Sequence, residues 1–200
     1  MTIPKNKAKK TAAASLAQTL RSGTVYRRED LVSSSNAVDR HLRELQDTGK
    51  LTKLSKGLYY APRQSVYGPV PPDDHDLVAA FLRDDDFLLF SPSSYNALGL
   101  GTTLLYNQTL VYNHKRHGRF KFGNRSFDFR MKHRFPGKLS AEFLLVDALN
   151  NLNLFAEERE TLLHGARAKA RDFDRAKLMQ AVEKYGSMAT KKLIKGWLNA

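Results

Sequence analysis

The segment that most constrains the fold is residues 36–62, where a helical pattern of apolar residues passes directly into an alternating one. The apolar positions between residues 36 and 48 recur at spacings of 4 and 3: Val38, Leu42 and Leu45. This spacing predicts one buried helical face, and Gly49 is a suitable residue to end the helix. Residues 51–56 and 58–61 then alternate in polarity on either side of a turn. They predict a two-stranded β-hairpin that follows the helix without a linker.

The residues before this segment supply the remaining elements of a small domain. The sequence predicts a helix at 7–22, a short extended piece at 24–26, a short helix at 27–32 and capping residues at 33–36. Helix, strand, helix, turn, helix and hairpin is the order of a winged helix-turn-helix. We therefore expect residues 1–68 to form such a domain, with its last helix in a DNA major groove and its hairpin on the phosphate backbone.

Charge is concentrated in two basic segments. The chain has 200 residues and a formal net charge of +13, from 33 basic and 20 acidic side chains. Residues 1–62 contain 12 basic and 5 acidic groups, residues 63–112 contain 2 and 6, and residues 113–138 contain 9 and 1. A field of this size favours a polyanionic partner. The alternative is that the basic segments are ordinary solvated faces.

Two sets of candidate contact residues follow from this distribution. The predicted DNA-binding residues lie at the start of the helix at 36–48, along its polar face and on the hairpin: Ser35, Asn36, Asp39, Arg40, Arg43, Lys53 and Lys56. The predicted second basic surface surrounds an aromatic hairpin with a Gly123-Asn124 turn: Lys115, Arg116, Arg119, Lys121, Arg125 and Arg130. The hairpin is expected to present one apolar face and one cationic face.

The proline-rich segment 69–74 is the predicted domain boundary. We expect residues 69–200 to form a mixed domain with antiparallel strands and a C-terminal helical bundle, which makes the whole chain an α+β protein. Expected strands lie at 87–91 and 104–113, and expected helices follow from residue 140 onward.

Composition and motifs exclude several classes of function. The chain has no cysteine, and no apolar run approaches the roughly 18 residues that a membrane span needs, so we expect a cytoplasmic protein without a membrane partner. His114, His117 and His133 lie among cations and lack a carboxylate at metal-ligand spacing. No nucleophile or dinucleotide motif is complete. We therefore expect no catalytic residue, no metal, no cofactor and no enzymatic activity.

A family resemblance rests on several of these stretches. The run "VYRREDLVSSSNAVDRHLRELQDTGKLTKLSKGLYYAP" resembles the N-terminal winged helix of AbiEi-like antitoxins from bacterial type IV toxin–antitoxin systems. "FSPSSYNALGL", the aromatic hairpin and "SAEFLLVDALNNL" resemble the second domain of that family, in the same order.

The resemblance implies a transcriptional regulator that represses its own promoter through double-stranded DNA. It also implies that the C-terminal domain counteracts a cognate nucleotidyltransferase-like toxin, by acting on the toxin or on its RNA target. Gly186-Ser187 lacks the pair of carboxylates that would follow it in such a toxin, so this chain would be the antitoxin.

Two other functions remain open from the sequence. The chain could be a stand-alone winged-helix regulator whose C-terminal domain senses a ligand or oligomerises. It could instead bind RNA or the ribosome through its basic segments. A toxin gene beside the chain's own gene would favour the antitoxin, and competition between duplex DNA and structured RNA would test RNA binding.

Overall fold

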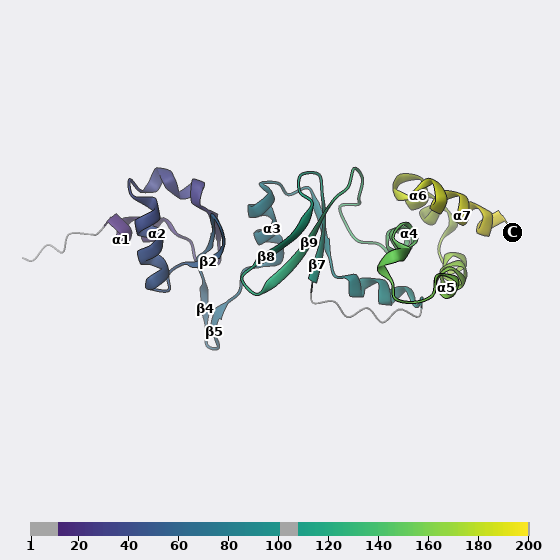
Figure 1. Cartoon of the computed structure of the whole chain (residues 1–200), viewed down its shortest axis with the longest axis horizontal. Coiled ribbons are helices and arrows are strands. Elements are labelled where there is room, and N and C mark those ends of the chain that lie inside the picture. The colour runs from purple at the N-terminus through teal and green to yellow at the C-terminus, as the bar shows by residue number, and fades with distance from the viewer. Residues whose placement is uncertain (1–11, 101–107, 200) are drawn as a thin grey trace, which may run out of the picture. The chain divides into compact units, whose positions relative to one another are not determined.

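The computed structural model describes residues 12–100 and 108–199, and the chain divides into two compact units (Figure 1). The first unit contains the residues up to Asp85 together with Lys121–Asn124, and the second contains Asp86–Phe120 and the residues from Arg125 onward. The fold is mixed α/β, with the helices of the second unit concentrated in its C-terminal half.

The first unit begins with helices and a three-stranded sheet. Its elements in chain order are α1 (Ala12–Thr19), β1 (Val25–Arg27), the 3-10 helix η1 (Arg28–Ser34), α2 (Val38–Asp47), β2 (Thr52–Ser55) and β3 (Leu58–Tyr60). The helix predicted at 36–48 and the hairpin predicted at 51–61 are both present, and the extended piece at 24–26 is β1. The sheet has the order β1-β3-β2, with both pairs antiparallel.

The core of the first unit explains why these short elements hold together. Buried side chains from α1, η1, α2 and the hairpin form one apolar cluster: Leu16, Leu31, Val38, Leu42, Leu45, Leu51, Tyr59 and Ala61. The three positions that predicted the helical face of α2 all belong to it. None of these elements could bury its apolar face alone, so the cluster is what stabilises them.

A second hairpin follows that the sequence analysis did not predict. β4 (Arg63–Ser65) and β5 (Gly68–Val70) pair antiparallel. Val66 and Tyr67 form the tip and are 93% and 98% exposed. The Tyr60 hydroxyl donates to the carbonyl of Val70 at 2.8 Å, which ties β5 to β3.

Helix α3 (Asp74–Leu82) belongs to the first unit, whereas the boundary predicted at 68/69 assigns it to the second domain. Asp73 caps the helix by accepting from two backbone amides of the first turn. Arg27 of β1 donates to the carbonyls of Ala80 and Phe81 at the end of α3. Arg83 also forms an ion pair with Glu29 of η1. These contacts hold α3 against the first unit.

The second unit contains a four-stranded sheet with the order β6-β7-β9-β8. The strands are β6 (Phe87–Phe90), β7 (Gln108–Asn113), β8 (Gly118–Phe122) and β9 (Arg125–Met131). The aromatic hairpin is therefore present, and the sheet combines the expected antiparallel pairing, between β6 and β7, with a parallel pairing of β7 and β9 that was not predicted.

The burial of β9 also corrects the predicted faces of the hairpin. Phe127 and Phe129 are buried, but Met131 is exposed, and Arg130 is mostly buried beside Asp128. Phe127, Asp128 and Phe129 are consecutive and all buried, so both faces of β9 are covered over this stretch.

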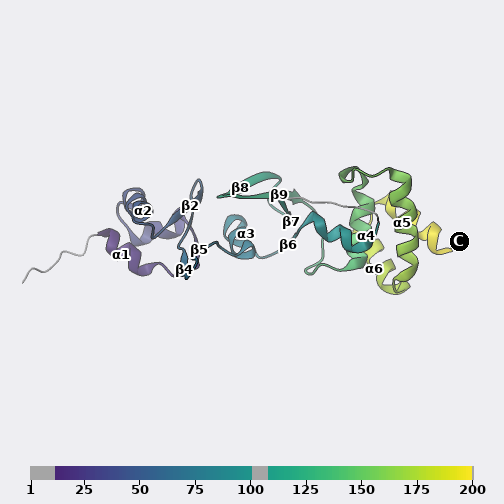
Figure 2. The same ribbon diagram turned by 90° about the horizontal axis from the view of Figure 1, so that it is seen from below.

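Helices complete the second unit, and Figures 1 and 2 show α4, α5 and α6 side by side. They are η2 (Pro92–Leu98), α4 (Ala141–Asn150), η3 (Leu152–Leu154), α5 (Arg159–Asp172), α6 (Arg175–Tyr185) and α7 (Met188–Asn199). Every residue of α4 from Phe143 to Leu149 is buried, so this helix is the centre of the core. Within the described residues, no helix is long and apolar enough to cross a membrane.

Candidate nucleic-acid interface

Helix α2 has one buried face and one charged face, as its sequence predicts. Val38, Leu42 and Leu45 are buried, while Arg40 and Arg43 are exposed. The charged face is not purely cationic, since it also carries Asp39, Glu44 and Asp47. Arg40 lies 3.9 Å from Glu44, a loose surface ion pair that leaves its guanidinium available to other partners.

His41 is a buried residue of α2 that the sequence analysis did not select. The Nη2 atom of Arg40 lies 3.3 Å from His41 Nε2, and the Oγ atom of Ser35 lies 2.6 Å from His41 Nδ1. A guanidinium can only donate, so Nε2 accepts and Nδ1–H donates to Ser35. Ser35 Oγ also accepts from the amide of Ala37.

This cluster changes the role expected for the residues before α2. The sequence analysis placed capping residues at 33–36, but the N-cap is Ala37 and it provides no side-chain cap. Ser35 instead anchors His41 and the turn. Its Oγ atom accepts two hydrogen bonds, so its own hydroxyl proton is left to donate elsewhere. Asn36 lies beside it and is exposed.

Asp39, one of the predicted contact residues, is paired with Arg28. The Nε and Nη2 atoms of Arg28 donate to its two carboxylate oxygens at 2.7 and 2.6 Å. The hydrogen bond from Arg28 lowers the pKa of the Asp39 carboxyl below its ordinary value. The amide of Arg28 also donates to the carbonyl of Gly57 at 2.9 Å. Arg28 therefore connects the hairpin turn to the first turn of α2.

The hairpin of β2 and β3 presents its lysines to solvent. Lys53 lies on β2 and Lys56 in the turn, and both are exposed. Gly57 completes the turn with a φ of +74°, a conformation that side chains rarely adopt. Tyr59 and Tyr60 are buried, so they pack within the unit and are not available to stack on bases.

The residues of the predicted second basic surface do not form a single exposed face. Lys115, Arg116, Arg119 and Lys121 are exposed, whereas Arg125 and Arg130 are partly buried. The amides of Lys115 and Arg116 donate to the side chain of Asn113, which shapes the loop between β7 and β8. Arg130 donates through Nε and Nη2 to one oxygen of Asp128, at 3.0 and 2.9 Å.

A buried polar network lies on α4 and was not predicted. Asp147 accepts hydrogen bonds of 2.6 Å from the hydroxyls of Tyr95 and Tyr112, and Asn151 donates to it at 3.2 Å. Lys132 lies 3.7 Å away. Burial and the Asp147 charge raise the pKa of both tyrosines. Because the carboxylate has all these partners, it is a structural anchor of the core.

Comparison with known proteins gives information on the fold alone. No protein-family model matches the sequence, and no curated protein matches it. Among solved structures, the crystal structure of the RV2827C protein from Mycobacterium tuberculosis is similar, with a TM-score of 0.55 and 16% sequence identity. The match covers 94% of this chain and 74% of that chain.

Proposed function

We propose that the first unit is a winged helix-turn-helix domain that binds double-stranded DNA and represses the chain's own promoter. The observation that carries this proposal is the pairing of α2 with an adjacent lysine-bearing hairpin. Arg40 and Arg43 are exposed on α2, Lys53 and Lys56 are exposed on the hairpin, and Arg28 connects the two elements. A repressor of its own promoter would act in the cytoplasm, and it would act by binding DNA and not by catalysis.

In this proposal α2 reads bases and the hairpin contacts phosphates. A bidentate arginine–guanine contact supplies about 1–3 kcal/mol of discrimination between bases. Phosphate contacts supply affinity without sequence preference and make binding depend on salt. Asp39, held by Arg28, would position the start of α2, and the free hydroxyl proton of Ser35 and the amide of Asn36 would donate to the backbone.

The test measures binding of the full-length chain to its promoter fragment and to a scrambled duplex by fluorescence anisotropy. We expect Arg40→Gln and Arg43→Gln to reduce the preference for the promoter, and Lys53→Gln and Lys56→Gln to weaken binding to both duplexes alike. Lys192→Gln, which removes an exposed cation from α7, is the control and should change neither.

The salt dependence gives a second measurement in the same assay. Each hairpin lysine that contacts a phosphate should contribute about 0.9 to the log–log slope of affinity against salt concentration. Full-length protein that is folded but binds neither duplex at low salt would disprove the proposal.

We further propose that the chain is the antitoxin of a type IV toxin–antitoxin system, with its C-terminal part counteracting a nucleotidyltransferase-like toxin. The support is the resemblance of residues 24–150 to the AbiEi-like family. Co-expression with the toxin encoded beside it should restore growth. The double variant Arg40→Gln and Arg43→Gln should restore growth as well, while losing repression of the promoter.

The antitoxin proposal can fail while the DNA-binding proposal holds. If promoter binding is intact but the chain never protects cells, and no toxin gene lies beside its own, the antitoxin function is wrong. The stand-alone regulator with a ligand-sensing second domain would then be the better description.

A further inference from the structure

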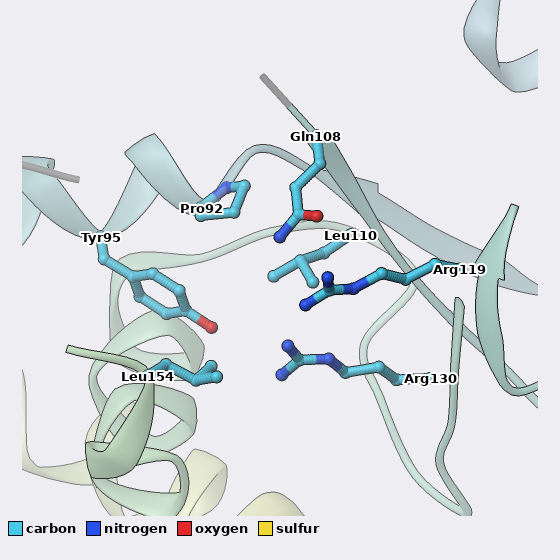
Figure 3. A pocket seen from close by; sticks show the side chains of 7 residues that line it. All are labelled: Pro92, Tyr95, Gln108, Leu110, Arg119, Arg130 and Leu154. Atoms are coloured by element: carbon cyan, nitrogen blue, oxygen red, sulfur yellow. The ribbon is translucent and has the colours of Figure 1, made fainter. Parts of the chain in front are cut away.

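A cavity of about 110 Å³ lies between the sheet and the helices of the second unit. Its lining comes from η2, β7, β8, β9 and η3, and Figure 3 shows these side chains directed toward a common space: Pro92, Tyr95, Gln108, Leu110, Arg119, Arg130 and Leu154. All seven residues belong to the same unit. The cavity therefore does not involve the residues of the proposed DNA interface.

Two arginines provide the charge of this cavity. Arg119 on β8 and Arg130 on β9 direct their guanidinium groups into it (Figure 3). Burial opposes the charge of Arg130, but its hydrogen bonds and attraction to Asp128 outweigh burial and raise its pKa. Arg130 and Asp128 are 19% and 11% exposed, so this pair is a fixed part of the wall.

Arg119 is the cation that lacks a partner. Its guanidinium forms no hydrogen bond or ion pair with any residue in the part of the chain that the structure describes. Asp128 neutralises Arg130, so the net charge of the lining is +1 and is carried by Arg119. The guanidinium of Arg119 faces that of Arg130. A monoanion between the two arginines would relieve their mutual repulsion, and it would accept from the fork of Arg119 and from the N–H groups of Arg130 that Asp128 does not use.

The remaining walls are apolar. Pro92, Leu110 and Leu154 supply the apolar lining, and the hydroxyl of Tyr95 already donates to Asp147. Gln108 adds one amide that can donate or accept. A cavity of about 150 Å³ holds a benzene molecule, so a space of about 110 Å³ fits a body smaller than benzene, such as a short aliphatic chain.

We propose that this cavity is a binding site for a small monocarboxylate. The carboxylate is held between Arg119 and Arg130, and its apolar body lies against Pro92, Leu110 and Leu154. A net charge of one cation favours a monoanion over a phosphate dianion, and the apolar walls favour a hydrocarbon body over bare inorganic anions. The site stands apart from the proposed function, because neither its residues nor its test involves DNA.

The experiment uses propionate as the probe on the full-length chain, with saturation-transfer NMR to detect binding and titration to measure its Kd. Propionamide, which has the same shape without the charge, and inorganic phosphate are titrated in parallel. We expect propionate to bind in the millimolar range or better, and both other probes to bind at least about tenfold more weakly.

Two variants locate the site. Arg119→Gln should weaken propionate binding by about tenfold or more, because it removes the unpaired cation and leaves the Arg130–Asp128 pair in place. Lys121→Gln removes an exposed cation from the same strand but not from the cavity lining, so its Kd should match that of the wild type. The proposal is overturned if folded wild-type protein does not bind millimolar propionate, if Arg119→Gln binds it equally well, or if phosphate binds better than propionate.

Discussion

Asp147 has the largest number of charged and polar partners among the buried residues of α4, and it is 2% exposed. Replacing it by alanine would leave the hydroxyls of Tyr95 and Tyr112 without their acceptor in the core. We expect Asp147→Ala to lower the free energy of unfolding by about 3 kcal/mol, as measured by urea denaturation. Asp172→Ala removes an exposed carboxylate from the end of α5 and should change stability by less than about 0.5 kcal/mol. Equal effects of the two substitutions would contradict the structural role of the network.

The same network makes a prediction about alkaline pH. Burial raises the pKa of Tyr95 and Tyr112, so their protons remain in the folded state at pH values where the unfolded chain, with tyrosine pKa values near about 10, has lost them. Unfolding then releases protons, and stability falls as the pH rises above about 10. Tyr112→Phe should reduce the slope of unfolding free energy against pH by up to about 1.4 kcal/mol per pH unit, because one such group is removed. Tyr67→Phe, at a position 98% exposed, should leave the slope unchanged.

Sequence patterns gave the least information about the roles of single residues. The apolar spacing identified Val38, Leu42 and Leu45, but it did not identify His41, because a buried histidine needs a hydrogen-bond partner that only the folded turn provides. Arg28 and Asp39 are eleven positions apart in the chain, and no local spacing rule joins them. The pairing of Asp147 with two tyrosines depends on how α4 lies against η2 and β7, which is a property of the tertiary structure.

At the scale of elements, Gly186 in the turn between α6 and α7 and Gly196 within α7 form a matched pair for substitution. A Cβ added at Gly186 would lie 2.6 Å from the carbonyl oxygen of Val182, whereas one added at Gly196 within α7 would meet nothing within 4 Å. Gly186→Ala should destabilise the chain by about 1–3 kcal/mol through this clash. Gly196→Ala should stabilise it by about 0.5–1 kcal/mol through helix propensity. Urea denaturation of both variants checks the difference in sign.

Most elements were predictable because their signals are local. Asp73, Ser91 and Ser140 each cap the helix that follows them, and Gly123-Asn124 forms the turn between β8 and β9 as expected. The hairpin of β4 and β5 was missed because its three-residue strands show no alternation of polarity. Helix α5 begins only at Arg159, and Leu152–Leu154 before it forms a separate 3-10 turn.

At the scale of the whole molecule, the position of α3 determines which fragment is complete. Residues 1–85 retain the hydrogen bonds from Arg27 to Ala80 and Phe81, and residues 1–68 lose them together with the ion pair between Arg83 and Glu29. We expect the longer fragment to have the higher Tm and the sharper transition in thermal denaturation followed by circular dichroism. Equal melting curves would show that α3 adds nothing to the first unit.

Local sequence patterns also could not predict the order of the strands in the sheet of the second unit. The aromatic alternation of residues 119–131 correctly predicts a hairpin. It does not indicate which other strand pairs with the free edge of β9. That edge pairs with β7, which precedes it in the chain, and the pairing is parallel. This pairing places β9 inside the sheet, where Arg130 contributes to the lining of the charged cavity.

The strand order β6-β7-β9-β8 also has a consequence for synthesis on the ribosome. β6 and β7 can pair as soon as both have emerged, but β8 finds its partner only when β9 follows. At elongation rates of about 5–20 residues per second, β8 waits on the order of a second with Phe120 and Phe122 uncovered. The nascent chain is therefore most prone to aggregation or chaperone capture in that interval, and a slow codon placed between the two strands would lengthen it.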